Sequence, residues 1–304
     1  MGYQIQQVNL KSDYEGKVVA TIISSRSSNS SGKAVLYIHG FIDYFFQDHL
    51  ADAFTQNGIN FYALELRKYG RSLLPHQHPN YCKNIHEYFE EIDRSIEKIV
   101  AEGNLSVALI GHSTGGLVAS LYCSKGRYAS KVSGLILNSP FLEYNVSFAI
   151  RTATLVASAI CSPFPFACVK GVLSPLYAQS VHKSHKGEWS FNLAWKPIEG
   201  FPSYFRWIIA IRNGHNQVKK GLKIACPILV MHSSSSLLPK KWTDEIMKSD
   251  IVLNVEHMKK YGKKLGANVE FYEVKDGMHD LVLSRKDVRE KVLEKMVAWS
   301  KNVL

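Results

Sequence analysis

The sequence predicts an α/β fold built on a mostly parallel sheet, and three observations lead to this prediction. Short apolar runs alternate with longer stretches of helical periodicity near both ends of the chain. Most of these runs are apolar throughout, which is typical of strands buried on both faces of a parallel sheet. The chain has 304 residues of which 46% are hydrophobic, so it can bury one large core or two smaller ones.

Eight runs are expected to form strands, and they alternate with five candidate helices, so we expect one sheet with helices on both faces. The expected strands are residues 3–10, 17–23, 34–39, 60–65, 106–111, 133–138, 227–232 and 268–274. The expected helices are residues 47–56, 86–101, 116–125, 255–265 and 287–301.

The alternation stops near Phe141 and resumes near Cys226. The interval is rich in aromatic residues and shows no obvious strand, so we interpret 142–225 as an inserted helical cap. Residues 1–141 and 226–304 would then form the core domain. Within the cap, 152–169 carries no charged residue, but Pro163 and Pro165 interrupt it. A buried or interfacial helix is therefore expected there, rather than a membrane span.

The net charge of +11 is concentrated in the cap. Between Glu143 and Lys223, ten Lys or Arg residues stand against three Glu residues, a surplus of seven. This surplus has two interpretations: an ordinary solvated face, or a surface that attracts anionic lipid or an anionic substrate. The dense basic runs with interleaved aromatic residues that bind nucleic acid are not seen, so no nucleic-acid partner is expected.

The five cysteines are scattered and show no C-x-x-C spacing, so neither a disulfide framework nor a zinc site is expected. The polar N-terminal segment does not resemble a secretory signal. We therefore expect a reduced, cytoplasmic protein that is peripheral to a membrane if the basic cap binds lipid.

The most informative motif is Gly-His-Ser-Thr-Gly at 111–115, which follows an apolar strand and precedes a helix. This is the G-x-S-x-G pattern of a nucleophile elbow. Glycines on both sides of Ser113 allow a turn so sharp that a side chain there would collide with neighbouring backbone. The N–H groups at the start of the helix point at any oxyanion that develops beside the serine.

A nucleophilic serine needs a base, and His279 is the candidate. In the chain order Ser…Asp/Glu…His that accompanies such an elbow, the histidine follows the last strand. His279 is the one histidine of twelve in that place, in the loop before the final helix.

The carboxylate that orients the base should follow the strand at 227–232, where Asp244, Glu245 and Asp250 are the candidates. We favour Asp250, with Asp244 second. Because Asp250 precedes a predicted helix, an N-cap role is the alternative explanation for it.

The oxyanion hole is expected to combine the Thr114 N–H with the Phe41 N–H, which lies on the loop after the third strand. Gly40 allows that loop to turn tightly. His39 is expected to be a structural histidine bonded to local backbone.

With these residues the chain resembles the α/β-hydrolase superfamily, in particular the group of monoacylglycerol lipases, lysophospholipases and serine aminopeptidase-like proteins. The motifs that carry the resemblance are His39-Gly40-Phe41, Glu65 to Ser72, Gly111 to Gly116, Pro227 to His232, and Gly277 to Asp280. Two substitutions occur in the second motif, where the family usually has Asp-x-Arg-Gly-x-Gly-x-Ser. Residues 233–249 look like an insertion before the acid.

The resemblance implies hydrolysis of a carboxylic ester through an acyl-enzyme, with a Ser113–His279–Asp250 triad and neither metal nor organic cofactor. The aromatic cap favours a hydrophobic acyl group, and its basic charge suits a monoacylglycerol- or lysophospholipid-like substrate at an anionic membrane. The alternatives are a small-molecule esterase, an aminopeptidase-like hydrolase in which Glu143 or Glu188 binds the amine, or a catalytically silent binding protein. The sequence gives no indication of oligomeric state.

Overall fold

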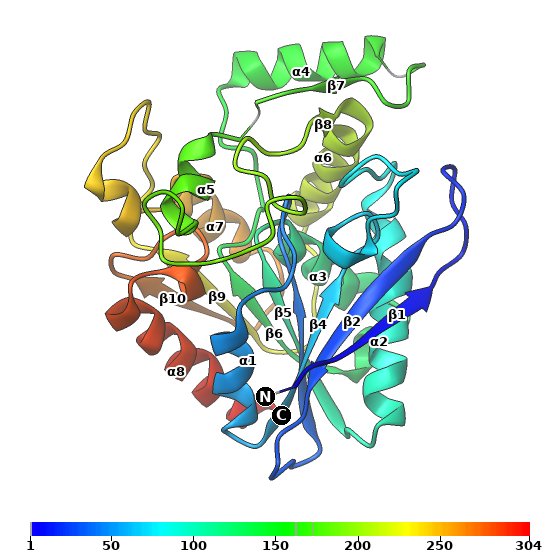
Figure 1. The fold of residues 1–304 in the computed structure, drawn as a ribbon, viewed down its shortest axis with the longest axis vertical. Helices are drawn as coiled ribbons and strands as arrows, with labels where there is room; N and C mark the ends of the chain where they lie inside the picture. Colours follow the sequence, from blue (N-terminus) through cyan, green and yellow to red (C-terminus); the bar gives the residue numbers. More distant parts are fainter. Residues whose placement is uncertain (1, 162, 172) are drawn as a thin grey trace.

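The fold was analysed in a computed structural model that describes residues 2–161, 163–171 and 173–304. Its centre is an eight-stranded sheet in the order β1-β2-β4-β3-β5-β6-β9-β10 (Figure 1). The strands of this sheet are β1 (Gln4–Asn9), β2 (Val19–Ser25), β3 (Lys33–Ile38), β4 (Ile59–Glu65), β5 (Ser106–His112), β6 (Val132–Asn138), β9 (Ile228–Ser233) and β10 (Val269–Val274).

The predicted mostly parallel sheet is confirmed. Strand β2 runs antiparallel to both of its neighbours, β1 and β4, and all ladders from β4 to β10 are parallel. Each of the eight expected strands is present within a few residues of its predicted bounds. Parallel strands end at the same edge, so the loops after β3, β5, β9 and β10 gather at one end of the sheet.

Helices cover both faces of the sheet. They are α1 (Asp48–Thr55), α2 (Phe89–Ala101), α3 (Thr114–Lys125), α4 (Phe148–Ile160), α5 (Pro175–Val181), α6 (Phe205–Lys220), α7 (Val255–Gly262) and α8 (Lys286–Val303). Short 3₁₀ helices occupy Gly70–Ser72, Ile85–Tyr88, Ala129–Lys131, Asp244–Lys248 and Leu281–Leu283. The helix predicted over 86–101 thus begins with a 3₁₀ turn, which the Asn84 and Glu87 side chains cap reciprocally.

Two apolar cores lie on opposite faces of the sheet, because successive side chains of a strand point in opposite directions. Val35 and Tyr37 of β3 pack in the core formed with α1 and α8. Leu36 and Ile38 pack in the other core, together with α2 and α3. This two-sided burial explains why the strand sequences are apolar throughout.

The interval between β6 and β9 holds α4, α5, α6 and the two-residue strands β7 (Cys168–Val169) and β8 (Ser203–Tyr204). Figure 1 places α4 and α5 beyond the carboxyl edge of the sheet, whereas α6 descends and packs against α3. The interval shows no obvious strand in the sequence, and the structure adds one short antiparallel pairing there, of β7 with β8. That short pairing left no periodicity to detect. The division into core and cap at 142 and 225 stays a prediction. Below, 'cap' denotes the interval between β6 and β9.

The uncharged stretch 152–169 is not one helix. Helix α4 ends at Ile160, before Pro163 and Pro165, which cannot continue a helix easily. Within the part of the chain that the structure describes, no helix has the length and apolarity needed to cross a membrane.

Candidate active site

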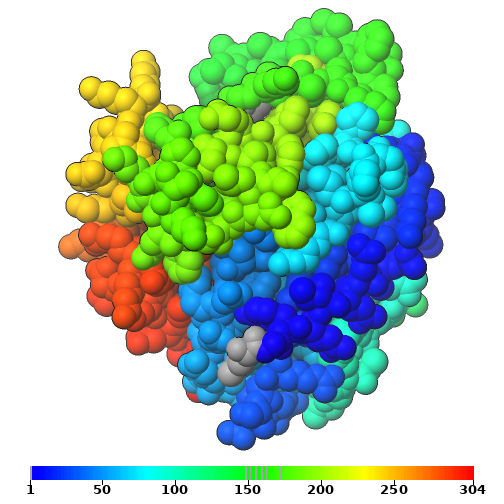
Figure 2. Space-filling model, viewed as in Figure 1, coloured from blue at the N-terminus to red at the C-terminus, as the bar shows by residue number. Residues whose placement is uncertain are grey.

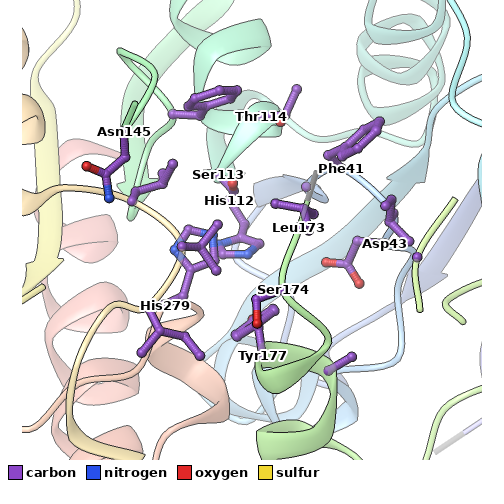
Figure 3. Close-up of a pocket in the computed structure, with 18 of the residues that line it drawn as sticks. Phe41, Asp43, His112, Ser113, Thr114, Asn145, Leu173, Ser174, Tyr177 and His279 are labelled. Carbon is purple, nitrogen blue, oxygen red and sulfur yellow. The ribbon is translucent and has the colours of Figure 1, made fainter. Parts of the chain in front are cut away.

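The predicted site residues gather at a cavity of about 270 Å³ between the carboxyl edge of the sheet and the cap. Ser113, His279, Phe41 and Thr114 all line this cavity (Figure 3). Asp250 lies directly behind His279 and is fully buried. The five residues come from four loops that follow β3, β5, β9 and β10, so the sheet topology is what brings them together.

Ser113 occupies a sharp turn between β5 and α3. Its backbone has φ 50° and ψ −116°, a conformation that L-residues rarely adopt and that neighbouring structure must maintain. The Ser113 carbonyl accepts hydrogen bonds from the N–H groups of Gly116 and Phe141 at 3.0 and 2.9 Å. The turn is therefore bonded both to its own helix and to the loop after β6.

Two glycines of the motif are required by close backbone contacts. A Cβ at Gly115 would lie 2.3 Å from the carbonyl oxygens of both Ile38 and His39 at the end of β3. A Cβ at Gly111 would lie 2.6 Å from Gly116 Cα. Helix α3 therefore starts in contact with the end of β3, which places Ser113 beside the loop that carries Phe41.

His279 is bonded to the buried carboxylate of Asp250 through the Nδ1 atom of its ring. The distance from His279 Nδ1 to Asp250 Oδ2 is 2.8 Å. A carboxylate in this position fixes the tautomer with the proton on Nδ1, which leaves Nε2 free to accept a proton. The imidazole also lies between the rings of His112, at 4.9 Å, and Tyr177, at 5.4 Å, measured between centroids.

The structure separates the three candidate carboxylates. Asp244 and Glu245 are exposed in the 3₁₀ helix Asp244–Lys248, whereas Asp250 is buried against His279. The N-cap of α7 is Asn254, so Asp250 does not cap that helix. Its second oxygen instead accepts the N–H groups of Val252 and Leu253 at 2.9 and 2.7 Å.

The insertion suspected before the acid is an excursion whose two ends are joined. The Asp250 N–H donates to the Ser235 carbonyl, and the Leu237 N–H donates to the Asp250 carbonyl, both at 2.9 Å. The chain therefore leaves the end of β9, makes a loop, and returns Asp250 to almost the place where it left.

A buried network that the sequence did not indicate holds the loop of His279. Asp280 accepts hydrogen bonds from Asn138 at 2.6 Å and from Gln47 at 3.3 Å. Asn138 in turn accepts the Leu281 N–H at 3.2 Å. This network ties the loop after β10 to the end of β6 and to the start of α1. The adjacent acidic residue in the His279-Asp280 pair was its one signal in the sequence.

The loop after β3, which carries Phe41, has a strained backbone at the next residue, Ile42. Ile42, a β-branched residue, has φ 51°, a value at which such side chains are rare. The Phe41 ring stacks on Trp207 of α6 with 4.0 Å between centroids. Thr114 is the first residue of α3, where a helix leaves its N–H groups without intrahelical acceptors.

His39 forms local backbone bonds as expected. Its Nε2 accepts the Leu66 N–H at 3.1 Å and its Nδ1 lies 2.8 Å from the Gly40 carbonyl. Burial lowers the pKa of His39 to about 4, so the ring stays neutral at physiological pH.

A second charged pair lies in the cavity wall and joins the core to the cap. Lys196 Nζ is 2.6 Å from Asp43 Oδ1, and both side chains are almost completely buried. Burial alone would raise the pKa of Asp43, but Lys196 and neighbouring histidines lower it below its usual value. This pair is not predictable from the sequence, because the partners are far apart in the chain and neither belongs to a recognised motif.

Asp43, His112 and Asp280 place three potential ligand atoms within 4.8 Å of one another. These groups already have partners. The Lys196 ammonium balances the charge of Asp43, and Asp280 uses both oxygens for Asn138 and Gln47. The cluster is therefore explained as a hydrogen-bonded ion-pair network.

Replacement of Gly115 by Ala should destabilise the protein strongly, by about 3 kcal/mol or more, because the new Cβ meets backbone that cannot move aside. Urea unfolding measures the change. Gly214→Ala in α6 is the matched control, since its Cβ would meet only the ends of Leu117, Leu121 and Ile85 at 3.2–3.3 Å. An equal loss in both variants would contradict the proposed backbone constraint.

The neutral His39 should make stability depend on pH. Because the folded pKa is lowered from 6.5 to about 4, the unfolded chain takes up a proton first as the pH falls. The contribution is complete above pH 6.5 and is lost towards pH 4, on the order of 3 kcal/mol in total. His39→Gln should flatten the unfolding free energy over this range, whereas His76→Gln, at an exposed site, should leave the slope unchanged.

Comparison with known proteins identifies the family. The sequence profile of the family described as serine aminopeptidase, S33, matches residues 29–282, which is most of the chain. Among curated proteins, none matches the sequence significantly.

Solved structures share the fold. A soluble variant of monoglyceride lipase from Saccharomyces cerevisiae, in complex with a substrate analog, has a TM-score of 0.73 and 17% identity, with 97% of this chain and 94% of that chain covered. Monoacylglycerol lipase of Paleococcus ferrophilus has a TM-score of 0.67 and 16% identity, with 99% of this chain and 100% of that chain covered. A thermostable carboxyl esterase from Bacillus coagulans has a TM-score of 0.66 and 15% identity, with 98% of each chain covered. At these identities the likeness concerns the fold, and with the profile match it shows that the chain belongs to the serine aminopeptidase S33 family of α/β hydrolases.

Proposed function

We propose that the protein is a serine hydrolase that cleaves a carboxylic ester with a hydrophobic acyl group, similar to a monoacylglycerol or a lysophospholipid. One observation carries the proposal: His279, bonded to the buried Asp250 at 2.8 Å, shares a cavity with the strained Ser113. A serine, a base and an orienting carboxylate are the groups that nucleophilic acyl transfer requires.

In the proposed first half-reaction, Ser113 Oγ attacks the ester carbonyl carbon while His279 Nε2 takes the hydroxyl proton. Asp250 stabilises the imidazolium that results. The N–H groups of Phe41 and Thr114 stabilise the oxyanion, an effect worth about 3–4 kcal/mol for each donor. When the C–O bond to the alcohol breaks, His279 returns the proton to the leaving oxygen, and the acyl group remains on Ser113.

In the second half-reaction a water molecule attacks the acyl-enzyme carbonyl, and His279 Nε2 takes its proton. The second tetrahedral intermediate uses the same oxyanion donors. It collapses by breaking the bond to Ser113 Oγ, which regains its proton from His279. The products of this step are a carboxylic acid and the regenerated enzyme. The reaction therefore needs no co-reactant other than water.

The lining of the cavity supports a hydrophobic acyl group. Its apolar part is formed by side chains from the loop after β3, the loop after β6, the cap and the segments on both sides of Asp250, namely Phe41, Phe141, Tyr144, Val146, Leu173, Ile198, Trp207, Leu238, Ile251, Val252 and Leu253. The charged pair Asp43–Lys196 also lies in the wall and offers hydrogen-bonding groups to a polar alcohol. Apolar ligand surface with a few placed polar groups is typical of small-molecule sites.

Aminopeptidase activity is the second candidate, because the family description names it. A free amino terminus needs an unpaired carboxylate in the cavity. Asp43 is the acidic residue that lines the described part of the cavity, and Lys196 already neutralises it. Glu143 and Glu188 are bonded to Lys219 and Arg289 and do not appear in the cavity wall. The contacts therefore favour an ester.

A catalytically silent binding protein is the third candidate. It would not require a bond between His279 and a buried carboxylate, nor strain at Ser113. The retention of both features supports an enzyme.

The proposal predicts hydrolysis of p-nitrophenyl esters and monoacylglycerols that improves with acyl length until the apolar wall is filled. Lysophospholipids belong in the same panel, with an aminoacyl p-nitroanilide as the amide control. Ser113→Ala should lower kcat by about 10³-fold or more and abolish labelling by a fluorophosphonate probe. Cleavage of the anilide without the esters would favour the aminopeptidase. No labelling of the native protein would favour the silent protein.

The role of Asp250 can be separated from that of its competitor. Asp250→Asn should lower kcat on a p-nitrophenyl ester by about 10²–10⁴-fold, because the imidazole loses its orienting charge. Asp244→Asn is the matched control and should stay within about twofold of wild type, as expected for an exposed surface substitution. A collapse of activity in the Asp244 variant alone would overturn the assignment.

A further inference from the structure

Two segments project at the carboxyl end of the sheet, where the cavity lies, and neither is needed for the proposed chemistry. One is α4 together with residues 163–170, which we call the α4 prong. The other is the loop 235–243 of the insertion before Asp250, which we call the insertion prong. Figure 1 shows both at the carboxyl end of the sheet, and Figure 2 shows them as separate protrusions on the surface, green and yellow.

The α4 prong exposes apolar side chains that a monomer in water would normally bury. Ile150 and Val156 of α4 are each 55% exposed, Ile160 is 70% exposed and Phe164 is 68% exposed. Large exposed apolar side chains gathered on one short segment are typical of interaction surfaces.

The insertion prong also exposes an apolar side chain, next to two lysines. Leu238 is 66% exposed, and Lys240 and Lys241, two and three residues later, are exposed as well. This loop is the part of the acid segment that departs from the family pattern, and the bonds at its base hold Asp250 independently of its tip.

Around the α4 prong, the charged residues are of one sign over a long stretch of sequence. Residues 144–187 contain two Arg or Lys residues in the α4 prong, two further lysines and no Asp or Glu. Within the described ranges, Lys170, Lys240 and Lys241 form no ion pair with another residue. Apolar side chains bordered by unpaired lysines complement an anionic lipid surface, in which acyl chains lie beneath negative headgroups.

The prongs are continuous with the cavity. Val146, which is two residues before α4 and 40% exposed, lines the cavity, and so does Leu238 of the insertion prong. We propose that the α4 prong and the insertion prong dock together on an anionic phospholipid bilayer, so that the cavity mouth faces the lipid between them. Docking itself does not depend on the proposed hydrolysis, but its benefit to an acyl substrate rests on that function.

Vesicle co-sedimentation tests the docking. The protein should bind phosphatidylcholine vesicles that contain phosphatidylglycerol at roughly 0.01 M salt, where screening is weak, and bind pure phosphatidylcholine much less. Each lysine near an anionic surface strengthens binding about fivefold, so Lys240→Gln with Lys241→Gln should weaken it at least tenfold. Ile160→Ser with Phe164→Ser should weaken it to a similar degree through the apolar contact.

Matched controls come from the opposite end of the sheet. Leu105→Ser removes an exposed apolar residue that is 92% exposed just before β5. Lys131→Gln with Lys263→Gln removes two exposed lysines before β6 and β10. Both controls should bind vesicles as wild type does. In all of these variants kcat/KM on a short soluble ester should stay unchanged.

Absence of vesicle binding by the wild type, or equal loss in the control variants, would overturn the proposal. Dimerisation that Ile160→Ser with Phe164→Ser abolishes, without vesicle binding, would overturn it and assign the α4 prong to a second copy of the chain. The inactive Ser113→Ala variant should bind vesicles normally. Loss of ester cleavage therefore reports failure of the proposed function, whereas loss of binding reports failure of the docking inference.

Discussion

The arrangement of the site depends on one contact, the approach of Gly115 to the carbonyl groups at the end of β3. Without a side chain at that position, α3 begins against the loop that carries Phe41. Phe41, Ser113 and Thr114 thereby come to line the same cavity. Two residues with positive φ, Ser113 and Ile42, stand on either side of this contact. Such conformations cost on the order of 1–3 kcal/mol each and persist because the packed sheet leaves no alternative.

The cap is part of the site as well as its cover. Trp207 stacks on Phe41, Lys196 is bonded to Asp43, and Tyr177 lies against His279. Two of these cap residues thus contact Phe41 and His279, which we propose to act in catalysis, and the third contacts Asp43 in the cavity wall. Because packed interiors transmit displacements, substitutions in the cap are expected to alter the position of groups that the core provides.

The strands, the elbow and His279 could be predicted from the sequence, because each has a local signal: an apolar run, two glycines beside a serine, a position after the last strand. Asp250 was harder to predict, because an insertion separates it from β9 in the sequence and only the folded loop returns it to the end of that strand. The pairs Asp43–Lys196 and Asp280–Asn138 were not predicted from the sequence. They join residues more than a hundred positions apart, and their stability comes from burial that no local pattern reveals.

Salt is expected to affect the buried pair Asp43–Lys196 much less than the exposed lysines of the two prongs. Salt screens charges that face water over distances of about 10 Å at 0.1 M, but it has little effect on a pair enclosed by protein. The lysines of the prongs face solvent, whereas Lys196 is only 6% exposed. Rising salt would therefore release the protein from a charged surface, whereas the ion pair between Lys196 of the cap and Asp43 of the core would persist. Ionic conditions would then control where such an enzyme works and leave its catalytic geometry intact.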